Sequence, residues 1–127
     1  MRRIGALMLM LLLVPLGTVS AAEVSKDTSA RVNLISEKAS KMSSSKVGEY
    51  ARQDVGAAQT SISEAKLAMA AGNEKLAQQK IELAEMQLTI AEARTAEKEA
   101  LEQATLKRAE LKKLEAQLDS FFKEGGK

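Results

Sequence analysis

The fold is decided at residues 69–77, MAAGNEKLA, where Gly72 is followed directly by Asn73. A glycine accepts the left-handed backbone that closes one helix, and an asparagine caps the start of the next. The alternative is a glycine tolerated inside one long helix, at a cost of about 1 kcal/mol relative to alanine. We expect the first arrangement, with Gly72 and Asn73 at the apex of a helical hairpin.

Residues 74–122 carry apolar side chains at the a and d spacing of a heptad repeat, which is typical of a long helix packed on another helix. Glu97 and Lys107 interrupt this series. We expect the seam to loosen locally at these two positions. Its apolar members are Leu76, Leu83, Met86, Ile90, Ala93, Ala100, Ala104, Leu111, Leu114, Leu118 and Phe121.

The chain before the turn carries two apolar stripes that are out of phase across residues 43–48. This segment holds three consecutive serines and then Gly48, so it predicts either a stutter in one long helix or a break that makes a separate first helix. The first stripe includes Val32, Ile35 and Met42, and the second includes Val55, Ile62 and Met69.

Two arms of nearly equal length, about 25–71 and about 74–122, can fold back on each other at the turn. We therefore predict an all-α fold, a long antiparallel coiled-coil-like hairpin with a kink or short break near residues 43–48, and three separate helices as the alternative. In this register Phe121 and Phe122 cover Val24 at the open end, and residues 123–127 form a short tail. The expected pairs are Met69 with Leu76, Ile62 with Leu83, Val55 with Ile90, Met42 with Ala104, Ile35 with Leu111, and Val32 with Leu114.

The N-terminal residues 1–22 match a secretory signal peptide, with Arg2 and Arg3 before an apolar run and small residues before Glu23. Cleavage after Ala21 and cleavage after Ala22 both satisfy the small-residue rule, and an uncleaved anchor is the alternative. We expect export to the periplasm. The chain contains no cysteine, which excludes a lipid-anchored lipoprotein and disulfides.

Removing the two signal arginines from the 19 basic residues leaves 17 basic against 17 acidic residues. The basic character of the whole chain therefore belongs to the predicted signal. A global electrostatic attraction to nucleic acid is not expected in the exported form.

A series of residues on both sides of the Ala71-Gly72-Asn73 turn carries a resemblance: Tyr50, Ala51, Ala58, Ile62, Ala65, Leu76, Ala77, Ile81, Ala84 and Ala91. With these residues the chain resembles a known family of bacterial exported proteins, the Ala-rich helical module called domain of unknown function 4398. The resemblance covers residues 30–97 and implies a Gram-negative periplasmic or envelope setting, with no catalytic residues to carry over. The chain has Arg52 where members often have proline, and Asn73 where they often have aspartate.

Enzyme chemistry is not expected, because the chain lacks histidine and cysteine, the usual proton shuttles, thiol nucleophiles and soft metal ligands. We predict no catalytic site, cofactor, metal site or small-molecule substrate. The acidic side chains of the second arm are interpreted as a solvated, salt-bridged helix face rather than a cation site. They are Glu82, Glu85, Glu92, Glu99 and Glu102.

A basic cluster near the end of the second arm is the sharper candidate site. It suggests contact with an anionic membrane surface, with Phe121 and Phe122 beside it, although bases near a helix C-terminus also complement the helix dipole. We favour the dipole interpretation. The cluster consists of Lys107, Arg108, Lys112 and Lys113.

The alanine-rich seam buries little apolar area, so further association is expected to supplement it. Our first hypothesis is a structural or adaptor protein that binds a second copy or another envelope helix through an apolar edge. The alternative is a holdase-like chaperone or membrane-surface binder that uses its apolar stripe and terminal phenylalanines. We expect this edge to consist of Ile81, Leu88, Leu101 and Leu106.

Overall fold

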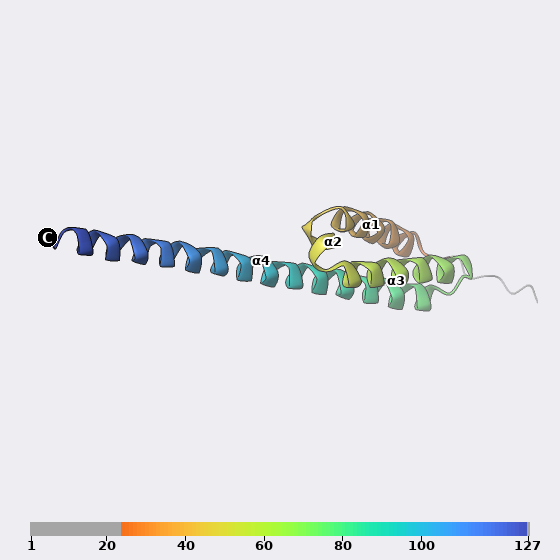
Figure 1. Cartoon of the computed structure of the whole chain (residues 1–127). Helices are drawn as coiled ribbons and strands as arrows, with labels where there is room; N and C mark the ends of the chain where they lie inside the picture. The colour runs from red at the N-terminus through yellow and green to blue at the C-terminus, as the bar shows by residue number, and fades with distance from the viewer. Residues whose placement is uncertain (1–23, 127) are drawn as a thin grey trace, which may run out of the picture.

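The computed structural model describes residues 24–126 and shows an all-α protein, as predicted. Four helices are joined by short turns in this range: α1 (Lys26–Ser43), α2 (Lys46–Tyr50), α3 (Arg52–Ala70) and α4 (Glu74–Glu124). α3 and α4 form an antiparallel hairpin, α1 lies against both, and the far half of α4 projects alone (Figure 1). The predicted export signal lies outside the described residues.

The turn between α3 and α4 lies at Gly72 and Asn73. Gly72 has a φ of 70° and donates its N–H to the Met69 carbonyl oxygen at 3.0 Å, while the Asn73 N–H reaches Ala68 O at 2.9 Å. These two bonds form the Schellman motif that satisfies the last carbonyls of a helix. The Asn73 side chain then caps α4 by accepting the Leu76 N–H at 3.1 Å. One residue thus closes α3 and the next opens α4.

The serine-rich segment is a sharp reversal that separates α1 from α3. The Ser45 hydroxyl accepts the Val47 N–H at 3.2 Å, which caps the start of α2. It also donates to the Met42 carbonyl oxygen at 2.8 Å, at the end of α1. At Gly48 an added Cβ would lie 2.1 Å from the Ser43 carbonyl oxygen. Only glycine lets α2 approach the end of α1 this closely.

Because the chain reverses here, α1 packs beside α3 and the first half of α4 instead of extending along the second half. Val32 packs with Ala65 and Ile81, and both Ile35 and Met42 join a core cluster built from all the longer helices. The predicted pairs Val32 with Leu114, Ile35 with Leu111, Met42 with Ala104, and Val24 with Phe121 are therefore wrong.

The reversal has a physical reason in the alanine-rich interface between α3 and α4. Ala58, Ala65 and Ala84 are fully buried there, but each methyl group removes little area from water. At about 25 cal/mol per Å² of apolar surface, a third helix with larger side chains adds stabilisation that a two-helix seam lacks. The association expected of the hairpin is thus partly supplied by α1 of the same chain.

The buried polar side chains all have partners. The Thr28 hydroxyl donates to Glu74 Oε1 at 2.8 Å, Ser61 donates to Gln87 Oε1 at 2.9 Å, and Thr95 donates to the carbonyl oxygen one turn before it. Among residues 24–126 no buried side-chain nitrogen or oxygen lacks a hydrogen-bond partner. The bundle core therefore holds no orphaned polar group that would point to a missing ligand.

Ion pairs between helices line the first half of α4. They are solvent-exposed, so each contributes at most about 1 kcal/mol, but together they favour one register of the bundle. α1 and α2 contribute the pairs Arg31 with Glu85 at 3.0 Å, Lys38 with Glu92 at 3.0 Å and Lys46 with Glu99 at 3.1 Å; α3 contributes Asp54 with Arg94 at 2.9 Å and Glu64 with Lys80.

Candidate interaction surface

The projecting half of α4 is the most unusual surface of the described chain. Every residue from 100 to 126 is exposed, and Figure 1 shows this part of the helix extending well beyond α1, α2 and α3. Large apolar side chains lie along it, among them Leu114 with 61% and Phe121 with 76% of their surface exposed. Exposed apolar side chains at regular spacing make this part of α4 a candidate interaction surface.

α4 presents two different apolar faces. The inner face packs into the bundle and consists of Ala77, Ile81, Ala84, Leu88, Ala91 and Thr95. The second face, which we call the outer seam, follows the heptad of the sequence. It consists of Leu83, Met86, Ile90, Ala93, Glu97, Ala100, Ala104, Lys107, Leu111, Leu114, Leu118 and Phe121.

The outer seam stays accessible even where α4 is packed. Met86 and Ile90 are each two residues from the buried Leu88, which at about 100° per residue places them on the opposite side of the helix. Met86 is 59% exposed and Ile90 is 40% exposed. The seam therefore runs as one accessible row from the bundle to the end of the projecting half.

The residues predicted for the helix seam divide into three groups. Those of the first arm are buried or half-buried in the bundle, those next in the chain lie at its margin with part of their surface exposed, and the last three are exposed on the projecting half. In that order they are Val32, Ile35, Met42, Val55, Ile62 and Met69; then Leu76, Leu83 and Ile90; then Leu111, Leu114 and Leu118.

Two residues assigned to a spare apolar edge lie elsewhere. Ile81 and Leu88 are fully buried in the bundle, so their assignment to an exposed edge was wrong, whereas Leu101 and Leu106 are exposed. The heptad pattern did not predict the inner face, because larger apolar residues stand one position before Ala77, Ala84 and Ala91 and dominate the pattern. Its own signal was available: Ile81 and Leu88 alternate with alanines at the same heptad spacing.

The junction between bundle and projection is fixed by α2. The Tyr50 hydroxyl donates to Glu102 Oε2 at 2.9 Å, and this hydrogen bond raises the pKa of Tyr50. Lys98 Nζ lies 4.6 Å from the centre of the Tyr50 ring, a cation–π distance. The hydrogen bond of Lys46 to Glu99 likewise raises the pKa of Lys46. These contacts anchor α4 where its packed half ends.

Four of the five acidic side chains predicted to form a salt-bridged face of α4 bond to the bundle; for Glu82 the structure gives no such contact. Glu85, Glu92 and Glu99 reach α1 and α2, and Glu102 accepts from Tyr50. Across the described helices no group of three or more acidic side chains is gathered as a metal site would require. The carboxylates therefore connect helices.

The basic cluster lies wholly on the projecting half, where Lys107, Arg108, Lys112 and Lys113 are exposed. At about 100° per residue these side chains spread around the helix and do not form one face. Lys107 also pairs with Glu110 at 2.8 Å. The geometry gives no concentrated anion-binding patch.

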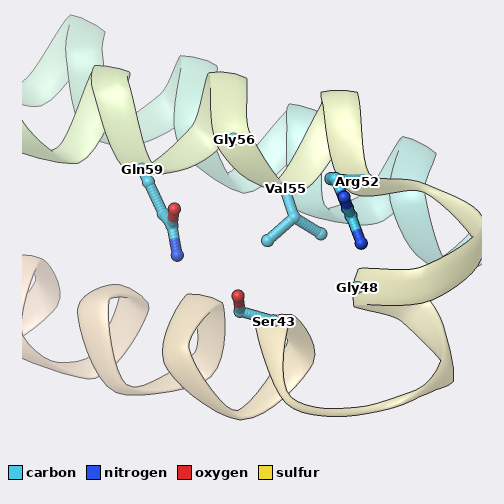
Figure 2. A pocket seen from close by; sticks show the side chains of 6 residues that line it. All are labelled: Ser43, Gly48, Arg52, Val55, Gly56 and Gln59. Carbon is cyan, nitrogen blue, oxygen red and sulfur yellow. The ribbon is translucent and has the colours of Figure 1, made fainter.

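The hollows of the surface are small and open. One of about 290 Å³ lies where the end of α1, α2 and the start of α3 meet (Figure 2). Val55, Arg52 and Gln59 extend into it from α3 toward Ser43. Its lining has one charged side chain, that of Arg52, and no carboxylate beside it. This hollow therefore offers no acid–base pair for catalysis.

Comparison of the chain with protein-family models, with curated proteins and with solved structures found no match. The resemblance to domain of unknown function 4398 stays a prediction. None of the helices within residues 24–126 has the length and apolar content needed to cross a membrane.

Proposed function

We propose that this chain is an exported periplasmic or envelope protein with a non-catalytic structural or adaptor role. The bundle of α1, α3 and the first half of α4 is the base, and the projecting half of α4 binds another helix through the outer seam. One observation carries the proposal: every residue from 100 to 126 is exposed, although the outer seam supplies large apolar side chains there.

A helix of this kind is poorly stabilised on its own. In proteins most helical stability comes from the packing of an apolar face rather than from intrinsic propensity, and the projecting half has no such packing within its own chain. The projecting half has its apolar side chains at heptad spacing, which is the pattern that packs knobs into holes on a second helix. A helical partner would bury them and stabilise the helix.

Export and the absence of enzyme chemistry are part of the same proposal. Support comes from the signal-like N-terminus, the lack of histidine and cysteine, and the resemblance to an Ala-rich envelope module. Fully satisfied polar groups in the bundle core and the small hollows are consistent with a scaffold role.

In-cell photo-crosslinking tests the proposal directly. A photo-reactive residue replaces Leu114 in the outer seam, and the control replaces Ala116, two positions away on the opposite side of α4. We expect discrete protein adducts from position 114 and few from position 116. Equal yields at both positions, or none at either, would refute a specific helix-binding surface.

A holdase-like chaperone or membrane-surface binder is the second candidate function. It is favoured by Phe121 and Phe122, which are 76% and 69% exposed near the basic cluster. The test is the aggregation of an unfolded outer-membrane protein at equal molar ratio, together with binding to anionic vesicles. Slower aggregation or vesicle binding that Phe121→Ser with Phe122→Ser abolishes would favour this candidate.

A further inference from the structure

Two charged residues stand in the outer seam, and they suggest what covers it. In heptad terms Glu97 occupies an a position and Lys107 a d position, while the other members of the seam are apolar. Glu97 is exposed, and Lys107 is bonded to Glu110 in its own helix. A charge at a core position of a coiled coil specifies which partner and register are allowed, because an unpaired buried charge is costly.

We propose that the partner of the outer seam is a second copy of this chain, bound antiparallel and centred at Glu102. This inference rests on the proposed function and names its partner. In the dimer each seam residue faces the residue equally far on the other side of Glu102. Every a position then meets a d position, as antiparallel coiled coils require. The layers are Leu83 with Phe121, Met86 with Leu118, Ile90 with Leu114, Ala93 with Leu111, Glu97 with Lys107, and Ala100 with Ala104.

The register is self-complementary in charge and in size. Glu97 of each copy meets Lys107 of the other. The dimer therefore contains two pairs of opposite charge at the two positions that interrupt the apolar seam. Ala100 meets Ala104 at the centre, where two small residues let the helices approach closely. Leu101 flanks the centre in both copies and is brought next to its own symmetry mate, which covers an otherwise exposed leucine. Charged, small and large positions each find a suitable partner.

Other arrangements of the same two helices leave charges unpaired. In a parallel dimer Glu97 faces Glu97 and Lys107 faces Lys107, so like charges are buried together. An antiparallel register shifted by one heptad places Glu97 opposite an apolar residue, and Lys107 as well. Both alternatives carry the cost of uncompensated buried charge. The antiparallel register centred at Glu102 avoids it.

The bundle leaves room for this partner. α1 bonds to α4 through Glu85 and Glu92, and α3 bonds to it through Lys80 and Arg94, so both helices flank the inner face. The outer seam lies on the remaining side. On the exposed flanks the dimer brings Arg94 near Arg108 and Glu82 near Glu124, like-charge pairs that cost a few tenths of a kcal/mol at such positions. Asp54 already neutralises Arg94 at 2.9 Å.

The seam is also long enough. Residues 83–121 span more than five heptads, above the roughly three to four that identify a coiled coil. The projecting half of α4 in one copy then lies along the packed half of α4 in the other. Each bundle supports the partner's projecting helix.

Charge reversal tests the register in sedimentation equilibrium of the exported form that begins at Glu23. Glu97→Lys alone and Lys107→Glu alone each place like charges opposite one another, and we expect each to raise the dimer dissociation constant about tenfold or more. The double variant restores opposite charges and should recover the original constant. Parallel pairing predicts no loss in either single variant and hence no rescue, and this outcome would overturn the proposal. Circular dichroism checks that each variant keeps its helices.

Disulfide trapping gives an independent answer, since the chain has no cysteine of its own. We expect a mixture of Ala100→Cys and Ala104→Cys proteins to form a mixed crosslinked dimer on oxidation, while either variant alone crosslinks far less. Ala109→Cys, an exposed alanine on the side of α4 opposite the outer seam, is the matched control. Efficient crosslinking of each single variant by itself would show a parallel dimer and overturn the proposal.

The same experiments separate this inference from the proposed function. A monomer at all concentrations, with adducts at Leu114 in cells to a different protein, overturns the self-association and leaves the helix-binding role standing. A monomer with no adduct at Leu114 defeats both. A dimer with mixed disulfides and charge rescue supports both.

Discussion

The two halves of α4 belong to one continuous helix but stand in opposite surroundings. In residues 74–95 an inner row of alanines with Ile81 and Leu88 is buried, and ion pairs on both flanks reach α1, α2 and α3. In residues 100–124 every side chain is exposed. Heptad periodicity is present in both halves, so periodicity alone does not distinguish a helix that is packed within its own chain from one that is exposed.

The inner face explains this difference. Continued past Thr95 at the same spacing, its positions fall on Lys98, Glu102 and Thr105, which are polar, so the bundle-facing row ends where α2 ends. The outer seam continues to Phe121. α4 thus has a buried face for part of its length and an exposed, largely apolar face for nearly all of it.

A leucine-to-alanine substitution in each half of α4 should give the largest difference in the free energy of unfolding. Leu88→Ala removes a fully buried side chain and should lower the free energy of unfolding by about 2 to 5 kcal/mol. Leu114→Ala, in the projecting half, should change it by less than about 0.5 kcal/mol in the monomer. Urea unfolding at low protein concentration measures both. Similar losses at the two positions would show that the projecting half is packed.

A second pair of variants tests the reversal that keeps α1 away from the projecting half. Gly48→Ala places a Cβ 2.1 Å from the Ser43 carbonyl oxygen and should destabilise the bundle by about 1 to 3 kcal/mol. Gly56→Ala lies within α3, where nothing is within 4 Å of the added Cβ, and should stabilise by about 0.4 to 1 kcal/mol. Thermal unfolding should move in opposite directions. Two shifts of the same sign would contradict the close approach of α2 to α1.

Much of this architecture follows from local sequence signals. Gly72 with Asn73 gives the position of the turn, and the heptad in residues 74–122 gives the long helix, because both depend on neighbouring residues. The direction of α1 does not follow from local signals, because Ile81 and Leu114 are both apolar and either could pack against Val32. That choice depends on how Ser45 and Gly48 turn the backbone and on the total area three helices bury. For the same reason local signals wrongly predict that Ile81 and Leu88 belong to an exposed edge, although the bundle covers both.

The turn offers a smaller and more specific test. Gly72→Ala forces a residue with a Cβ into a left-handed conformation, at φ 70°, and should cost about 1 to 2 kcal/mol. Gly72→Asn should recover part of this loss, because asparagine tolerates that region better. Chemical unfolding compares the two variants. If both variants lose the same free energy of unfolding, the contacts of Gly72 rather than its backbone angle determine the stability of the turn.

The smallest effect concerns the pH dependence of the packed half. Hydrogen bonds from Ser25 and Thr28 lower the pKa of Glu74 from its ordinary value of 4.5. A carboxyl whose folded pKa is lowered contributes stability above its unfolded pKa and loses it as the pH falls through the folded value. The contribution of Glu74 should therefore be complete above about pH 4.5 and decline below it.

Glu74→Gln should remove this component, leaving a shallower loss of stability on acidification, which thermal unfolding between pH 3 and pH 7 records. Glu110→Gln is the control, because Glu110 bonds only within the projecting half, to Lys107 at 2.8 Å. We expect the Glu110→Gln profile to follow that of the unmodified protein in the monomer. If Glu74→Gln also follows it, the link between Glu74 and α1 does not contribute to the stability of the bundle. A small effect confined to Glu74 would instead show that acid-sensitive contacts belong to the packed half of α4, where α1 reaches it.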